Sequence, residues 1–134
     1  MVKHHGVPSL EKKQLSIKVN ESNKNDIRKI LGIPSTTSKF DNDIWIYIER
    51  RQTQSKLKNL GKMKIIKNDV LVLEIDNTGI LLSKKFYNQN DMNKINFDEN
   101  ITGINYSKRS FIINFLSSIR QKIDDPLGKK RVKN

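Results

Sequence analysis

The residues of this sequence that could carry acid-base or metal chemistry are two neighbouring histidines and a few turn aspartates. His4 and His5 are adjacent, so their side chains point in different directions in any regular element, which makes them a poor pair of metal ligands. Asp41, Asp43 and Asp76 each lie in a segment typical of a turn, where aspartate is common because its side chain bonds to nearby backbone. We therefore expect no metal site and no catalytic residue.

The motifs that nucleotide-binding and hydrolytic enzymes use do not occur in the sequence. There is no G-x-x-x-x-G-K-[ST], G-x-G-x-x-G or G-x-S-x-G segment, so neither a phosphate-binding loop nor a hydrolase nucleophile turn is predicted. The chain has no cysteine, which excludes disulfides, thiolate zinc sites and a cysteine nucleophile. The sequence thus predicts a protein that is not an enzyme and that needs no cofactor.

Positive charge is the dominant chemical property of the chain. Its 134 residues include 26 lysines and arginines against 14 aspartates and glutamates, which gives a formal net charge of +12. Such a charge attracts nucleic acid and anionic membranes, because both are arrays of phosphates. Lysine, however, outnumbers arginine 20 to 6, and lysine, asparagine and isoleucine share A/T-rich codons, so part of the charge reflects composition alone.

Two aromatic residues are the main sequence evidence for a base-stacking surface. Trp45 and Tyr47 alternate with isoleucines, which predicts a strand with one aromatic and one aliphatic face. Aromatic residues at alternate positions more often pack within a sheet than stack on bases, and arginine is scarce. We expect no nucleic acid among the partners and keep a small basic nucleic-acid-binding protein as an alternative.

Turn residues and hydrophobic periodicity predict an α+β fold. Ser9 is a candidate cap for a short helical turn, and Ser22 is a candidate cap for a second short helix that ends at Gly32. We expect these two helices to pack on one face of a three-stranded antiparallel sheet, with an additional C-terminal amphipathic helix. The predicted strands are 44–50, 70–75 and 80–86, and the last two are joined by the turn Asp76-Asn77-Thr78-Gly79.

The chain divides into five predicted segments. They are a flexible N-terminal tether over residues 1–8, the helix-and-sheet domain over 9–86, a linker over 87–106, an amphipathic helix over 107–123 and a basic tail over 124–134. The helix carries an apolar stripe whose candidate contact residues are Phe111, Phe115 and Ile119, and Asp125-Pro126 is expected to end it. This stripe could dock on the domain's own sheet, lie on a lipid surface or fill a groove on a partner.

Two segments of the predicted domain carry a more specific pattern. A short helix runs into Leu31-Gly32-Ile33-Pro34-Ser35, a loop contains Phe40, and a strand follows with Trp45-x-Tyr47. Together they resemble the outer membrane assembly factor BamE family, also called SmpA/OmlA, over about residues 7–86. The C-terminal extension resembles that of alphaproteobacterial members. The family fold implied by this resemblance is also two short helices on a three-stranded antiparallel sheet.

The resemblance implies a non-enzymatic lipoprotein subunit of the β-barrel assembly (BAM) machinery, at the periplasmic face of the outer membrane. It implies binding to BamD-like and BamA-like subunits, with anionic phospholipid as a further ligand, and a monomer within a hetero-oligomer. The sequence shows no signal peptide and no lipobox cysteine, so the membrane location is an expectation from the resemblance alone. An inhibitor-like domain that blocks a partner's cleft is the remaining alternative.

The resemblance also indicates which residues could contact partners or lipid. Arg50 matches an arginine of the family's contact surface, and Ile46 takes the place of a residue that is often aromatic there. We expect contact surfaces at the loop from Ser35 to Phe40 and on the aromatic face of the sheet. The candidate contact residues of the domain are Ser35, Ser38, Phe40, Ile46 and Arg50.

Overall fold

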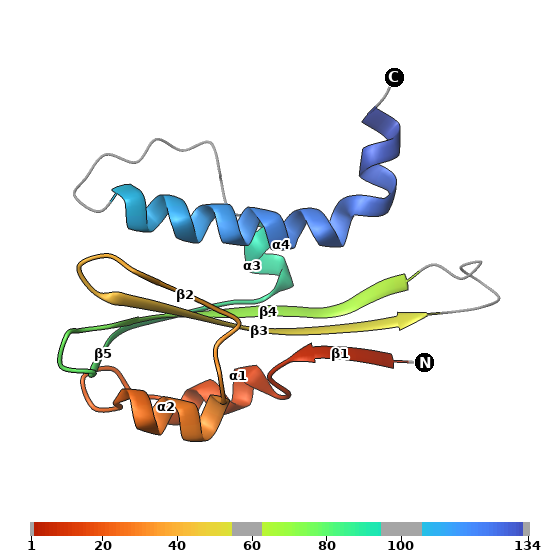
Figure 1. Cartoon of the computed structure of the whole chain (residues 1–134). Coiled ribbons are helices and arrows are strands. Elements are labelled where there is room, and N and C mark those ends of the chain that lie inside the picture. Colours follow the sequence, from red (N-terminus) through yellow and green to blue (C-terminus); the bar gives the residue numbers. More distant parts are fainter. Residues whose placement is uncertain (1, 55–62, 95–105, 133–134) are drawn as a thin grey trace. The chain divides into compact units, whose positions relative to one another are not determined.

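Figure 1 shows the computed structural model of the chain, which describes residues 2–54, 63–94 and 106–132. It divides into two compact units, Met1–Gln89 and Asn90–Asn134. The first unit holds the five described strands, the helices α1 (Leu10–Lys13) and α2 (Lys24–Leu31), and a short 3-10 helix, η1 (Gln14–Ser16). This unit has the α+β composition that the sequence predicts.

The sheet is antiparallel throughout and is built around two long strands. These are β3 (Asp43–Gln54) and β4 (Met63–Ile75), which pair with each other, while β5 (Leu81–Tyr87) pairs with the outer edge of β4. The three strands that the sequence predicts are therefore confirmed. The two strands of the β3–β4 hairpin are longer than predicted, because β3 continues past residue 50 and β4 begins before residue 70; residues 55–62 lie outside the described residues.

Two further strands occur where the sequence predicts irregular chain. β1 (Val2–Gly6) and β2 (Thr36–Lys39) lie end to end along the same edge of β3, opposite Glu49–Thr53 and Asp43–Ile46 respectively. The expectation of a flexible tether over residues 1–8 is therefore wrong for Val2–Gly6. Both strands are short and polar, and apolar and polar residues do not clearly alternate in their sequences. They form because they pair with the edge of β3 that β4 leaves free.

The helices begin and end through local hydrogen bonds. The predicted cap Ser22 does not cap α2: the cap is Asn23, whose side chain accepts from the N–H of Asp26 in a reciprocal capping box, while Ser22 Oγ accepts from the N–H of Lys18. The predicted cap Ser9 adopts a left-handed conformation and makes no side-chain cap bond. The end of α2 at Gly32, with φ of 81°, is confirmed.

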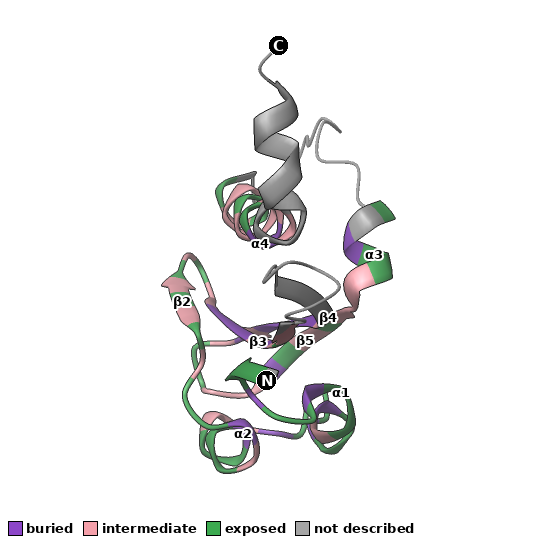
Figure 2. Ribbon diagram, turned by 90° about the vertical axis from the view of Figure 1, so that its right-hand side faces the viewer, coloured by how far each residue is buried: buried purple, intermediate pink, exposed green. Residues whose placement is uncertain are grey.

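The core of this unit lies between the two helices and one face of the sheet (Figure 2). Trp45 and Tyr47 are buried in it, and the Tyr47 hydroxyl donates a 2.9 Å hydrogen bond to the carbonyl of Gly32. The aromatic face expected to meet a partner is therefore covered by the domain's own helices. The other buried members of this core are Val7, Leu10, Ile17, Ile27, Leu31, Leu71, Leu73, Ile75 and Leu81.

The described residues of the C-terminal part form two helices. The first, α3 (Gln89–Lys94), falls within the segment predicted to be a linker, and residues 95–105 lie outside the described residues. The second, α4 (Tyr106–Val132), confirms the predicted helix but does not end at Asp125-Pro126. A proline removes one hydrogen bond of a helix and bends it without having to end it, and α4 bends in its C-terminal part (Figure 1).

The contact residues expected on α4 differ in burial. Phe111 and Phe115 are half-buried, and Ile119 is buried. None of the described helices has the length and hydrophobicity needed to span a bilayer.

Candidate partner-binding surface

Four of the five contact residues expected in the domain group around the start of β3. The N–H of the exposed Ser35 donates a 2.8 Å hydrogen bond to the carbonyl of Ile46, which fixes the chain at the start of β2. Ser38 lies opposite Ile44 and is half-buried, as is Phe40 just after β2. Among the described strands β2 pairs only with β3, so its outer edge presents backbone groups that a partner strand could use.

Arg50 stands apart from this group. It lies on the same face of β3 as Ile46 but about 14 Å further along, at roughly 3.4 Å per strand residue. Ile46 is fully buried, whereas Arg50 is half-buried. Burial lowers the pKa of the Arg50 guanidinium, and its Nε has no hydrogen-bond partner among the described residues.

A buried glutamate that the sequence does not single out holds the N-terminal segment on the sheet. Glu49 is 3% exposed, and its carboxylate accepts hydrogen bonds from the N–H of Leu10 at 2.9 Å and of Ser9 at 3.1 Å; His4 Nε2 lies 3.1 Å from the same group. Because Ser9 provides no side-chain cap for α1, a residue of β3 fulfils that role. The sequence signal that could have revealed this capping role is a glutamate on the same side of the strand as the two aromatic residues.

The environment of Glu49 makes its contribution to stability depend on pH. Burial alone would raise the pKa of Glu49, but hydrogen bonds from Leu10, His4 and Ser9 outweigh it, so the pKa lies below its ordinary value of 4.5. A carboxyl whose pKa is lower in the folded state contributes stability that is fully present above the unfolded pKa. That contribution is lost as the pH falls through the folded pKa.

We therefore expect Glu49→Gln to destabilise the protein at neutral pH and to cost progressively less as the pH falls from about 5 to about 3. Urea denaturation of both proteins across this range measures the difference in the free energy of unfolding. Glu21→Gln, at an exposed position, is the matched control and should show no comparable trend. A Glu49→Gln effect that is constant with pH would contradict this role of the carboxylate.

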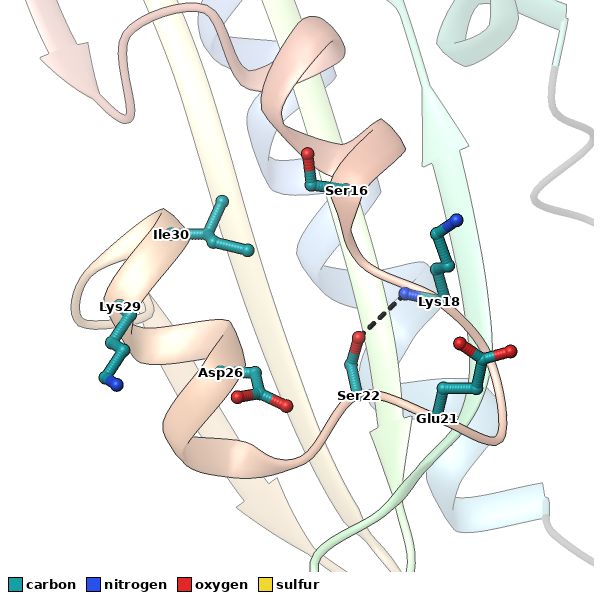
Figure 3. Close-up of a pocket in the computed structure, with 7 residues that line it drawn as sticks. All are labelled: Ser16, Lys18, Glu21, Ser22, Asp26, Lys29 and Ile30. Atoms are coloured by element: carbon teal, nitrogen blue, oxygen red, sulfur yellow. Dashed lines mark hydrogen bonds between the residues drawn. The ribbon is translucent and has the colours of Figure 1, made fainter.

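A cavity beside η1 and α2 offers no catalytic arrangement (Figure 3). It has a volume of about 320 Å³. Its only buried lining residue, Ser22, uses its hydroxyl to accept from the N–H of Lys18, and the lining contains neither histidine nor cysteine. No group of three or more metal-ligating side chains occurs within the described residues. The lining residues are Ser16, Lys18, Glu21, Ser22, Asp26, Lys29 and Ile30.

The helix-and-sheet unit matches a known protein family. A family model described as the outer membrane protein assembly factor BamE domain matches residues 9–85, more than half of the chain. The chain belongs to the BamE family. No curated protein matches the chain. The BamE domain implies a role in outer-membrane protein assembly, and the family is not known for enzymatic activity.

The BamE match and the structural unit have nearly the same limits. The matched segment begins just before α1 and ends within β5, so it contains both helices, the strands β2, β3 and β4, and most of β5. β1, with His4 and the glycine at position 6, precedes the matched segment. The N-terminal strand and its contacts with Glu49 are therefore features of this chain that the BamE domain itself does not describe.

Proposed function

We propose that this protein is a non-enzymatic scaffold subunit of the BAM complex, which stabilises contacts between other subunits at the periplasmic face of the outer membrane. The observation that carries the proposal is the match of the BamE domain to residues 9–85, which hold α1, α2, the strands β2, β3 and β4, and most of β5. The partners we propose are BamD-like and BamA-like subunits, with the protein as a monomer within the hetero-oligomer. Anionic phospholipid near Arg50 is a further proposed contact.

The surface that we propose for a protein partner is the edge formed by β2 and the loops beside it. Ile33, in the loop before β2, is 85% exposed, so a large aliphatic side chain is available for a partner to cover. Ser35 and Thr37 are exposed along the same edge, and the outer backbone of β2 is unpaired among the described strands. An apolar side chain beside a free strand edge suits addition of a partner strand.

The double variant Ser35→Arg, Ser38→Arg is expected to weaken binding to a purified BamD-like subunit by about tenfold or more, because two long charged side chains obstruct the edge. Calorimetric titration in buffer without lipid measures the affinity, and circular dichroism checks that the variant is folded.

The matched control is Ser16→Arg, Asn25→Arg, which adds the same charge at two exposed positions on η1 and α2. Its affinity should stay within about twofold of the wild type. Equal losses in the two variants would show that charge alone is responsible, and an unchanged affinity in the first would remove the β2 edge as the contact surface.

A further inference from the structure

The N-terminal strand β1 lies on the sheet without burying its described side chains. It pairs with Glu49–Thr53 of β3 (Figure 1), and every residue from Lys3 to Gly6 is exposed. Val7, directly after β1, is buried, and its N–H donates a 2.8 Å hydrogen bond to the carbonyl of Ile48. β1 can therefore leave the sheet by local opening, while the core that begins at Val7 stays in place.

A hinge for this opening lies at Gly6. Its φ of 88° is in the left-handed region, and glycine passes between this region and other backbone conformations at low cost. The residue that follows is held by its own hydrogen bond and by burial, so the chain can turn at Gly6 without disturbing the domain. β1 also precedes residues 9–85, so the BamE domain is defined without this strand.

On the face of the sheet that carries α1, β1 matches β3 well. His4 Nε2 lies 3.1 Å from the carboxylate of Glu49, which is 3% exposed. A hydrogen-bond donor at this position of the strand therefore meets a buried acceptor. The edge of β3 thus selects for a donor side chain here.

On the opposite face of the sheet, β1 matches β3 poorly. Arg50 lies opposite His5 on β1 and opposite Asn68 on β4, and it forms no ion pair with any described residue. Its Nε is buried and has no hydrogen-bond partner among the described residues. A histidine gives an arginine no counter-charge and repels it when protonated, because like charges directly opposite each other destabilise a sheet. An acidic side chain at the position of His5 would suit this edge better.

We propose that the Glu49–Thr53 edge of β3 is a docking site for an extended segment of a partner protein, which replaces β1 and carries an acidic residue where β1 has His5. Such a segment pairs with β3 through backbone hydrogen bonds, as β1 does. Its carboxylate faces Arg50, and a donor side chain at the position of His4 faces Glu49. This edge is separate from the β2 edge, and docking here does not depend on the proposed scaffold function.

The charge pattern is tested in the full chain with two variants of opposite expected effect. His5→Glu places a carboxylate opposite Arg50 and should slow hydrogen exchange at the hydrogen-bonded N–H groups of β1 by about twofold to fivefold. His4→Glu places a carboxylate beside Glu49 and should accelerate the same exchange by about tenfold or more. His5→Gln and His4→Gln are the neutral controls, and NMR measures the exchange rates.

Replacement of β1 by another chain is tested with a fluorescent peptide of residues 1–8 that carries His5→Glu, and with the same peptide carrying His5→Gln as its control. Fluorescence anisotropy in lipid-free buffer measures the affinity for the full chain, so phospholipid plays no part. The glutamate peptide should bind about twofold to fivefold more tightly than the glutamine peptide, and Arg50→Gln in the protein should abolish this preference. Both peptides should bind the His4→Glu protein more tightly than the wild type, because β1 is loosened in it.

A reversible cross-link tests whether β1 has to leave. Lys3 and Gln52 lie opposite each other, and directly opposite residues of antiparallel strands are close enough for a disulfide. The chain has no other cysteine, so Lys3→Cys, Gln52→Cys gives a single bridge. The oxidised protein should bind the glutamate peptide about tenfold more weakly than the reduced protein, or less tightly still. The reduced protein is the matched control, since it has the same sequence.

Five results would overturn this docking site. They are equal exchange rates in His5→Glu and His4→Glu, equal peptide binding by the oxidised and reduced proteins, and no preference of the wild type for the glutamate peptide. The others are a preference that persists in Arg50→Gln, and no peptide binding by either the wild type or His4→Glu. Dimerisation of the full chain through this edge, without peptide binding, would identify a second copy as the occupant and likewise contradict the proposal.

Discussion

Gly6→Ala is expected to lower the free energy of unfolding by about 2–4 kcal/mol, among the largest effects of any single substitution outside the core. Gly6 has a φ of 88°, in the left-handed region that disfavours other residues, and a Cβ built there would lie 2.0 Å from the carbonyl oxygen of Ile48. That oxygen accepts the 2.8 Å hydrogen bond from the N–H of Val7, so neither side of the contact moves freely. Urea denaturation of the full chain measures the loss.

A second glycine distinguishes the two causes of this loss of stability, which are the left-handed backbone conformation and the close contact of the added Cβ. Gly79 has a φ of 90°, but a Cβ added there would meet nothing within 4 Å, so Gly79→Ala tests the backbone conformation alone and should cost about 1 kcal/mol. In Gly6→Ala, hydrogen exchange at the N–H of Val7 should also accelerate, because β1 separates from β3. If Gly6→Ala and Gly79→Ala lowered the free energy of unfolding by similar amounts, the contact of the added Cβ with Ile48 would be relieved at no cost in free energy.

Leu71→Ala is expected to destabilise the protein by about 3–4 kcal/mol. Leu71 is fully buried on the central strand β4, opposite Tyr47 on one side and Phe86 on the other. Removing its isobutyl group leaves a cavity among side chains from two helices and three strands, which cannot all shift to fill it. The same urea titration measures the change.

Leu82→Ala is the matched control, since Leu82 is 40% exposed on the neighbouring strand β5. The expected cost there is below about 1 kcal/mol, because less apolar surface returns to water. If the two leucine variants were equally destabilised, the centre of the core would have to lie elsewhere than between the helices and β4.

The parts of the fold that the sequence predicts are those that local chemistry determines. The helix that ends at Gly32 and the turn at Asp76 both have residues whose own side chains or φ angles define the structure. Asp76 Oδ1, for example, accepts from the N–H groups of Thr78 and Ile80. The alternating isoleucines of β3 likewise define a strand by themselves.

The parts that the sequence does not predict depend on contacts with distant residues. β1 lies about 45 residues before the segment that it pairs with, and no pattern within Val2–Gly6 indicates a strand. The cap on α1 comes from Glu49, again from a different part of the chain. A two-residue capping pattern can be recognised along a sequence, but a carboxylate supplied by a neighbouring strand cannot.

The candidate partner-binding surface, too, is predicted from the sequence only where local residues determine it. The motif from Leu31 to Ser35 indicates the loop next to β2, but the edge itself is only apparent once β2 is seen to pair with β3. The prediction that Trp45 and Tyr47 form a contact face fails because alternation alone does not say which side of a strand the helices cover. The sequence places Arg50 with the other contact residues, yet the strand carries it away from them.

The end-to-end placement of β1 and β2 along β3 has a consequence for self-association. Long, regular strand edges recruit further copies of a chain into extended sheets, and short edge strands protect against this. In the described sheet the two longest strands, of 12 and 13 residues, are interior, whereas the outer strands have between 4 and 7 residues. Losing β1 would uncover the Glu49–Thr53 stretch of β3, so the N-terminal strand also protects the protein against aggregation.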